Sequence, residues 1–171
     1  MLAFLVAGGA SSSFAQKPAE KEAAVKEPAK DAASSEQAPW GSRCVAGARE
    51  SALDCLVEQK VYVAKTGQLI GAVTIRIPGE TKQPVMMIQT PVGLFLPAGV
   101  TVDVDSANAE KFELQTCDAS GCYVGSPMSK DLLERMQKGQ KLNVSFQNLQ
   151  KKVITLPMAL AGFAAAYQKV R

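Results

Sequence analysis

The chain has 171 residues, a formal net charge of +3 and no histidine. This length fits one domain with extensions, and a charge this small gives no argument for nucleic-acid binding. The lack of histidine removes the commonest general base, the Ser-His and Cys-His nucleophile pairs, and imidazole metal ligands. We therefore expect a protein that is not an enzyme and that needs no cofactor.

The N-terminus has the features of an export signal. Its first 16 residues carry no charged side chain, and residues 2–9 are apolar. Ser13 and Ala15 have the spacing of the small residues that precede a signal-peptidase cut. The apolar segment is much shorter than the roughly 20 residues that cross a bilayer. We predict a secretory signal peptide over residues 1–15, rather than the apolar end of a cytosolic protein, and no transmembrane segment.

Four cysteines follow this predicted export signal. An even number of cysteines in an oxidising compartment favours two disulfides. Three connectivities are possible, and we expect sequence neighbours to pair, Cys44 with Cys55 and Cys117 with Cys122. The alternatives are a zinc site of four cysteines, whose usual close spacing is missing, and a redox pair, which normally has two intervening residues at a helix N-terminus.

Residues 16–39 differ in composition from the rest of the chain. They are rich in Ala, Glu, Lys, Pro and Ser, and Val25 is their only large apolar residue. Such a stretch cannot repay the entropy of ordering. We expect a disordered tether there and a folded domain over residues 40–171. Trp40, the only tryptophan, begins this domain and is expected in its core, with a binding role as the alternative.

Most of residues 40–171 consists of short segments rich in β-branched residues and separated by turn signals. The pattern predicts strands over 40–44, 53–64, 69–77, 85–90, 93–96, 100–105, 111–117, 122–124, 142–146 and 153–156. The strand at 93–96 is expected to be short and buried, because Gly93, Pro97 and Gly99 interrupt the apolar run around it. Many short strands without βαβ alternation predict a mainly-β fold, a β-sandwich.

Two segments have helical patterns. Residues 129–138 begin with a suitable N-cap, Ser129, and Gly139 stops the predicted helix. A second helix is expected from Pro157 to the C-terminus, since proline suits a first helical turn. Its predicted apolar face consists of Leu160, Phe163, Ala164, Tyr167 and Val170.

Two residue pairs could carry chemistry. Asp103 and Asp105 lie two apart in a predicted strand, so both carboxylates would face the same way and could hold a cation or act as acid and base. The ordinary interpretation is the solvated face of an edge strand. Met86 and Met87 could bind copper, but a lone methionine pair usually packs in a core. We therefore assign no catalytic, cofactor-binding or metal-binding residue.

Several landmarks of residues 40–171 occur in a characteristic order. They are Trp40 and Cys44, then Cys55, then Pro-x-Gly-x-x-Leu-Pro-x-Gly over 91–99, then Cys117 and Cys122, then Leu-x-Gly-Phe-x-x-Ala over 160–166. This order resembles the invasion-associated locus B family of Gram-negative bacteria. The resemblance implies an exported periplasmic or outer-membrane-associated protein with an immunoglobulin-like β-sandwich. Founding members are linked to invasion of red blood cells, and no catalytic or binding residue carries over.

These observations lead to three functional hypotheses. The first is a non-enzymatic envelope protein that binds a partner, either a bacterial envelope component or a host-cell surface component. The second is a periplasmic ligand-binding protein or small enzyme that uses carboxylates such as Asp103 and Asp105. A third class, in which the disulfides are redox-active, would require bonds that are easily reduced.

Overall fold

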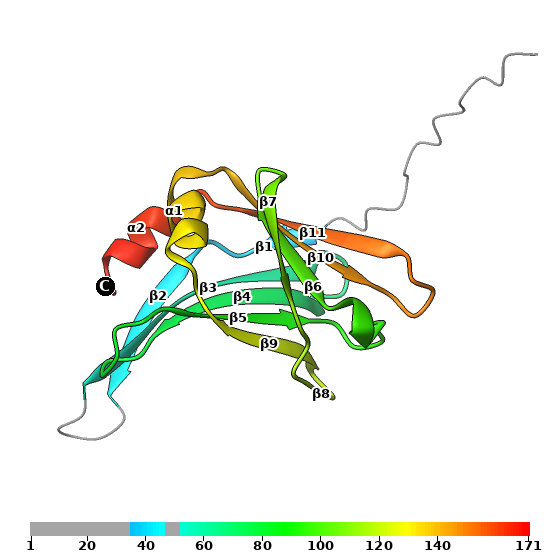
Figure 1. The fold of residues 1–171 in the computed structure, drawn as a ribbon, viewed down its shortest axis with the longest axis horizontal. Coiled ribbons are helices and arrows are strands. Elements are labelled where there is room, and N and C mark those ends of the chain that lie inside the picture. The colour runs from blue at the N-terminus through cyan, green and yellow to red at the C-terminus, as the bar shows by residue number, and fades with distance from the viewer. Residues whose placement is uncertain (1–34, 47–51) are drawn as a thin grey trace, which may run out of the picture. The chain divides into compact units, whose positions relative to one another are not determined.

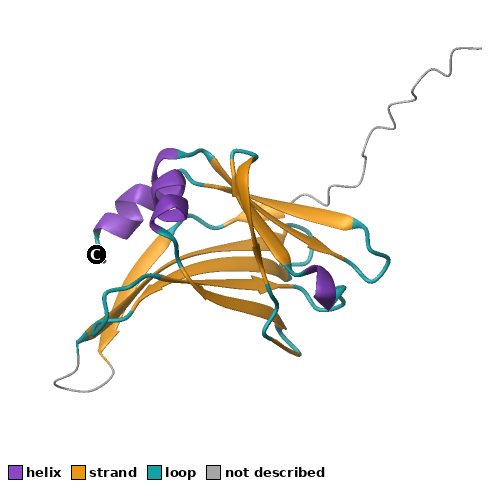
Figure 2. Cartoon of the chain, viewed as in Figure 1, coloured by secondary structure: helices purple, strands orange, loops and turns teal. Residues whose placement is uncertain are grey.

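The computed structural model describes residues 35–46 and 52–171. The predicted signal peptide and the predicted tether up to residue 34 lie outside the described residues. Two antiparallel β-sheets face each other, and two helices lie together at one end of the sandwich (Figures 1 and 2). The mainly-β sandwich expected from the strand pattern is thereby confirmed. No helix within the described ranges has the length and apolar character needed to span a bilayer.

The larger sheet has seven strands. They are β1 (Ser35–Gln37), β2 (Gly41–Ala46), β3 (Leu53–Val63), β4 (Leu69–Ile77), β5 (Val85–Thr90), β8 (Thr116–Asp118) and β9 (Gly121–Pro127). Their order is β1-β3-β4-β5-β9-β8, and β2 pairs with β3 along the same edge as β1. Alternate residues of β3 line the core: Cys55, Val57, Gln59 and Val61 are buried, and the residues between them face outward.

The smaller sheet has four strands in the order β11-β10-β6-β7. They are β6 (Val100–Val104), β7 (Ala107–Phe112), β10 (Lys141–Gln147) and β11 (Val153–Ala159). Val102 and Val144 pair across β6 and β10 and are almost fully buried against the larger sheet. The core lies between the sheets and is lined by alternate residues of their strands.

The helices close one end of the core. Helix α1 (Lys130–Lys138) begins where the sequence predicts, because the Ser129 side chain accepts a hydrogen bond from the Leu132 N–H at 3.0 Å. Helix α2 (Phe163–Gln168) contributes Phe163, which is fully buried. The Trp40 ring meets the Phe163 ring edge-on at 4.8 Å between centroids, so Trp40 belongs to the core as expected.

Both disulfides lie within the larger sheet and join neighbouring strands. Cys44 of β2 bonds to Cys55 of β3, and Cys117 of β8 bonds to Cys122 of β9, as expected for sequence neighbours. In each pair the two residues are also direct partners in the strand register. One cysteine of each pair is buried and the other is exposed. Each disulfide therefore secures a peripheral strand, β2 or β8, to the body of the sheet.

The ordered fold extends upstream of Trp40. Residues 35–37, within the stretch expected to be a tether, form β1 and pair with residues 61–63 at the end of β3. Composition could not show this strand, because its sequence, Ser-Glu-Gln, has no apolar residue. The strand forms because the edge of β3 beyond β2 offers unpaired backbone groups.

The apolar run 91–99 is not the short buried strand that the sequence predicted. Gly93 and Gly99 have φ of 79° and 67°, which interrupts an extended backbone. Leu94 alone makes a β-bridge, with Asn148, and Leu96–Ala98 form a short 3-10 helix, η1. Pro97 fits this turn because its missing N–H is not needed there.

Two other predicted elements have different bounds. The predicted strand 111–117 is divided, because the chain leaves the smaller sheet after Phe112 and joins the larger sheet at Thr116. The predicted helix start at Pro157 is also wrong. Residues 157–159 continue β11, and α2 begins only after Gly162. Pro157 is tolerated in a strand because β11 is at a sheet edge.

Candidate functional site

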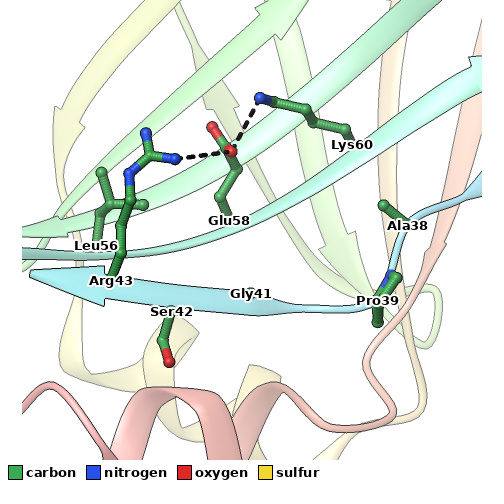
Figure 3. A pocket seen from close by; sticks show the side chains of 8 residues that line it. All are labelled: Ala38, Pro39, Gly41, Ser42, Arg43, Leu56, Glu58 and Lys60. Atoms are coloured by element: carbon green, nitrogen blue, oxygen red, sulfur yellow. Dashed lines mark ion pairs between the residues drawn. The ribbon is translucent and has the colours of Figure 1, made fainter.

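A cluster of charged side chains lies on the outer face of the larger sheet. Strand alternation turns Glu58 and Lys60 of β3 to this face, and the register places Arg43 of β2 beside them. The Glu58 carboxylate lies 3.0 Å from the Lys60 ammonium and 4.0 Å from the Arg43 guanidinium. It also accepts a hydrogen bond from the Thr74 hydroxyl at 3.3 Å. Figure 3 shows the two cations approaching Glu58 from opposite sides.

A hollow of about 200 Å³ adjoins this cluster and is bounded on one side by Ala38 and Pro39. Its cause is a glycine: Gly41 is the direct register partner of Glu58 and has no side chain to cover it. A Cβ placed on Gly41 would meet only the Glu58 carbonyl oxygen, at 4.0 Å. The backbone of β2 at Gly41 and the Glu58 side chain, which is 20% exposed, therefore both line this hollow (Figure 3).

A second ion pair extends the same face. Leu56 lies between Arg43 of β2 and Arg76 of β4, because all three are register partners across the strands. The Arg76 guanidinium hydrogen-bonds to Asp54, and the Gly79 N–H donates to the same carboxylate at 2.8 Å. These bonds hold the pKa of Asp54 below its ordinary value of 3.8, with the Arg76 bond the larger cause.

This arrangement offers charged groups that can bind another molecule. Arg43 is 61% exposed, and its long contact with Glu58 leaves guanidinium donors available to another molecule. The Glu58 carboxylate is paired with the Lys60 and Arg43 cations and accepts a hydrogen bond from the Thr74 hydroxyl. Within the described residues, no three His, Cys, Asp or Glu side chains are grouped to hold a metal ion.

A wider hollow of about 420 Å³ lies between α1 and the turn after β6. Its charges are paired inside the protein: Arg135 contacts Asp131 at 2.9 Å as well as Glu110, and Lys138 contacts Glu134 at 3.5 Å. The Arg135 guanidinium also donates to the Asn108 carbonyl at 2.9 Å. This cluster attaches α1 to β7 and leaves fewer free donors than the Arg43 cluster.

Asp103 and Asp105 do not form the paired site that their spacing suggested. The strand ends at Val104, and Asp105 has a φ of 53°, so the two carboxylates do not share a strand face. Asp103 accepts hydrogen bonds from the Ser106 N–H and the Asn143 amide, both at 2.8 Å. Asp105 accepts from the backbone N–H groups that begin β10. Both carboxylates are occupied in stabilising turns.

The two methionines also separate. Met86 is fully buried, as expected for a core residue, whereas Met87 is 42% exposed on the outer face of the larger sheet. Consecutive strand residues point to opposite faces, so this pair cannot bind one copper ion together.

The sequence interpretation did not single out Arg43, Glu58 or Lys60. A signal for them existed: pairing Cys44 with Cys55 as strand partners sets Gly41 opposite Glu58 and Arg43 opposite Leu56. That inference requires the two cysteines to lie directly across from each other, which the sequence alone does not establish.

The fold and this cluster define a two-sheet β-sandwich with two disulfides and an uncovered face on its larger sheet. A family model described as "Invasion associated locus B (IalB) protein" matches residues 40–171. The chain belongs to this family, as the landmarks around its cysteines indicated.

The structure is similar to the crystal structure of invasion associated protein B from Bartonella henselae. The TM-score is 0.65 at 17% sequence identity, and the match covers 78% of this chain and 93% of that chain. At this identity the similarity demonstrates the fold. Among curated proteins, none matches the chain.

Proposed function

We propose that the chain is an exported, non-enzymatic envelope protein that binds a protein partner through the outer face of its larger sheet. The observation that carries the proposal is the Arg43–Glu58–Lys60 cluster beside the hollow at Gly41. It presents cationic donors, a carboxylate and the apolar Leu56 on one open surface. Mixed polar and apolar groups of this kind are typical of protein interfaces.

Two further observations support export and a partner. The predicted signal peptide precedes a domain whose four cysteines form two disulfides, the state favoured in an oxidising compartment such as the periplasm. The family is named for invasion, and the similar structure from Bartonella henselae is named an invasion associated protein. We infer a partner in the bacterial envelope or, in a pathogen, on the host erythrocyte surface.

The alternative, binding of a small ligand, receives less support. The hollow at Gly41 holds about 200 Å³, whereas small-molecule sites usually enclose about 300–1,000 Å³. The wider hollow beside α1, about 420 Å³, has a suitable volume, but its charged side chains are paired inside the protein. A thermal-shift screen with sugars, peptides and divalent cations tests this alternative. A reproducible rise in Tm with one of them would favour the ligand-binding function over the partner-binding one.

The partner-binding proposal is tested by pull-down with the oxidised full chain as bait. One arm uses solubilised red-cell membranes, and the other uses an envelope extract of the source bacterium. The test variants are Arg43→Glu, which reverses an exposed charge, and Gly41→Val, which fills the hollow without a backbone clash. The control is Lys130→Glu, the same charge reversal in the first turn of α1, where an acid is tolerated.

We expect a protein from one of the two arms to be retained by the wild type and by Lys130→Glu, and to be lost with both test variants. Retention from red-cell membranes would make the role in invasion direct. Equal retention by all variants would place the binding surface elsewhere, and no retention in either arm would contradict the proposal.

A further inference from the structure

Exposed apolar side chains are concentrated at one end of the molecule, away from the helices. The described residues include eight large apolar side chains that are exposed, and five of them belong to two adjoining segments. We call these five the apolar tip: Val92, Leu96, Leu149, Val153 and Ile154. They share no residue with the charged cluster around Glu58.

The two segments of the apolar tip are held together by backbone contacts. Leu94 and Asn148 form a β-bridge, and the Phe95 N–H donates to the Gln147 carbonyl at 2.9 Å. The loop containing η1 therefore lies against the end of the β10–β11 hairpin, as Figure 1 also shows. Each tip residue is within a few positions of these contacts, so the five gather at the same end of the sandwich. Val153 and Ile154 are consecutive residues of β11 and point to opposite faces of that strand.

The charge of these segments has a single sign. Residues 91–101 contain no charged side chain, and residues 147–159 contain Lys151 and Lys152 but no acid. Both lysines are exposed. The Lys151 ammonium lies 5.0 Å from the centre of the Phe95 ring, which keeps this cation beside the apolar residues.

Exposed apolar side chains next to lysines are the combination that binds an anionic lipid surface. The apolar groups enter the boundary between headgroups and acyl chains, and the lysines pair with the headgroups. Isolated exposed apolar residues need no explanation, but five large ones gathered at one end of a molecule point to an interaction site. The two lysines, with no acid in either segment, complement the negative charge of such a lipid surface.

We propose that the apolar tip docks the domain on a membrane that carries anionic lipids. The docking is peripheral, with Leu149 and its neighbours inserted shallowly and Lys151 and Lys152 at the headgroups. In this orientation the tip faces the membrane, while the helices at the other end of the sandwich point away from it (Figure 1).

The test measures whether the apolar tip enters the lipid, by fluorescence quenching of a tryptophan placed in it. In the full chain, Leu149→Trp places an indole at a position that is 64% exposed, while the only native tryptophan, Trp40, is buried and serves as background. Vesicles contain phosphatidylglycerol and phosphatidylcholine, with brominated acyl chains as quencher. The matched control is Leu53→Trp, at a 52% exposed position at the far end of β3.

We expect quenching in Leu149→Trp and none in Leu53→Trp, and less quenching as salt rises. Lys151→Gln combined with Lys152→Gln should weaken vesicle binding by about 30-fold, because each of the two lysines would raise the affinity for an anionic surface by about the same factor. The same double change at Lys130 and Lys169, both exposed near the helices, should leave it unchanged.

Three results would overturn the proposal. The first is no quenching of Leu149→Trp, and the second is equal quenching of both variants, which would mean that another part of the chain binds lipid. The third is a dimer in lipid-free solution that Leu149→Ser dissociates, because a second copy would then cover the tip. Pull-down of a protein partner is independent of all three results.

Discussion

The side-chain amide of Gln37 occupies the free edge of β11 by bonding the backbone of Ala159. Its Oε1 accepts from the Ala159 N–H at 2.8 Å, and its Nε2 donates to the Pro157 carbonyl at 2.6 Å. The Trp40 indole N–H then donates to the Ala159 carbonyl at 2.8 Å. Because β1 pairs with the larger sheet, these three bonds connect the two sheets along one side of the sandwich.

Removal of this amide should destabilise the whole domain. We expect Gln37→Ala to lower the free energy of unfolding by about 1–2 kcal/mol, the net value of two hydrogen bonds. Hydrogen exchange at the Ala159 amide should accelerate, because that N–H loses its partner. The control is Gln83→Ala, at an exposed loop position. Unchanged exchange at Ala159 would show that Gln37 does not protect the edge of β11.

Two glycines should respond to alanine in opposite ways. A Cβ on Gly71 of β4 would collide with the end of the Leu156 side chain of β11, so that buried side chain would have to shift in the core. We expect Gly71→Ala to lower the free energy of unfolding by about 1–3 kcal/mol. A Cβ on Gly41 would point into open space, so Gly41→Ala should leave the free energy of unfolding unchanged or raise it slightly. Denaturant titration of both variants measures the contrast, and equal effects would contradict the close approach at Gly71.

Asp54 should make stability depend on acid pH. Its pKa is lowered in the folded state by Arg76 and by the Gly79 N–H, so the unfolded chain binds the proton more readily. The stabilisation is complete above the ordinary value of 3.8 and is lost as pH falls through the lower folded value. Thermal unfolding should show that wild type and Asp54→Asn differ at neutral pH and converge in acid. A difference that persists in acid would exclude this cause.

The two disulfides should contribute unequally. The Cys44–Cys55 link spans 11 residues and the Cys117–Cys122 link spans five. In the chain-entropy model, replacing each pair by alanines should cost about 3 and about 2 kcal/mol, respectively. Denaturant unfolding of the two double variants measures these costs.

The reduction potentials of the two disulfides separate a structural from a redox role. Reduction potentials well below about −300 mV would fit structural bonds, whereas higher values would support a redox role.

The sequence was sufficient to predict those elements whose formation depends on residues close together in the chain. Alternation of apolar and polar residues identified β3, β-branched residues identified β4, and the Ser129 cap with Gly139 identified α1. These elements depend on side-chain periodicity and on capping groups within a few residues, and both can be recognised in the linear sequence. For the same reason the disulfides between near neighbours could be anticipated.

The sequence could not reveal features that depend on distant strands. The chain crosses between sheets after Phe112 because Phe112 pairs with Val100 while Thr116 pairs with Tyr123. The same limit hid the charged cluster, since Arg43 reaches Glu58 only through the register of β2 and β3. It also made Asp103 and Asp105 look like a pair, although Asp103 bonds to Asn143 and Asp105 to Gln140, each more than 30 residues away.

The sequence by itself therefore determined the β-sandwich class, the family landmarks, α1 and the disulfide pairs. Tertiary structure decided how the sheets are joined, which strand continues past Pro157, and where charged and apolar residues gather on the surface. The physical reason is the same in each case. Backbone hydrogen bonds such as those at Ala159, and contacts such as Leu94 with Asn148, form between segments whose proximity only the complete fold establishes.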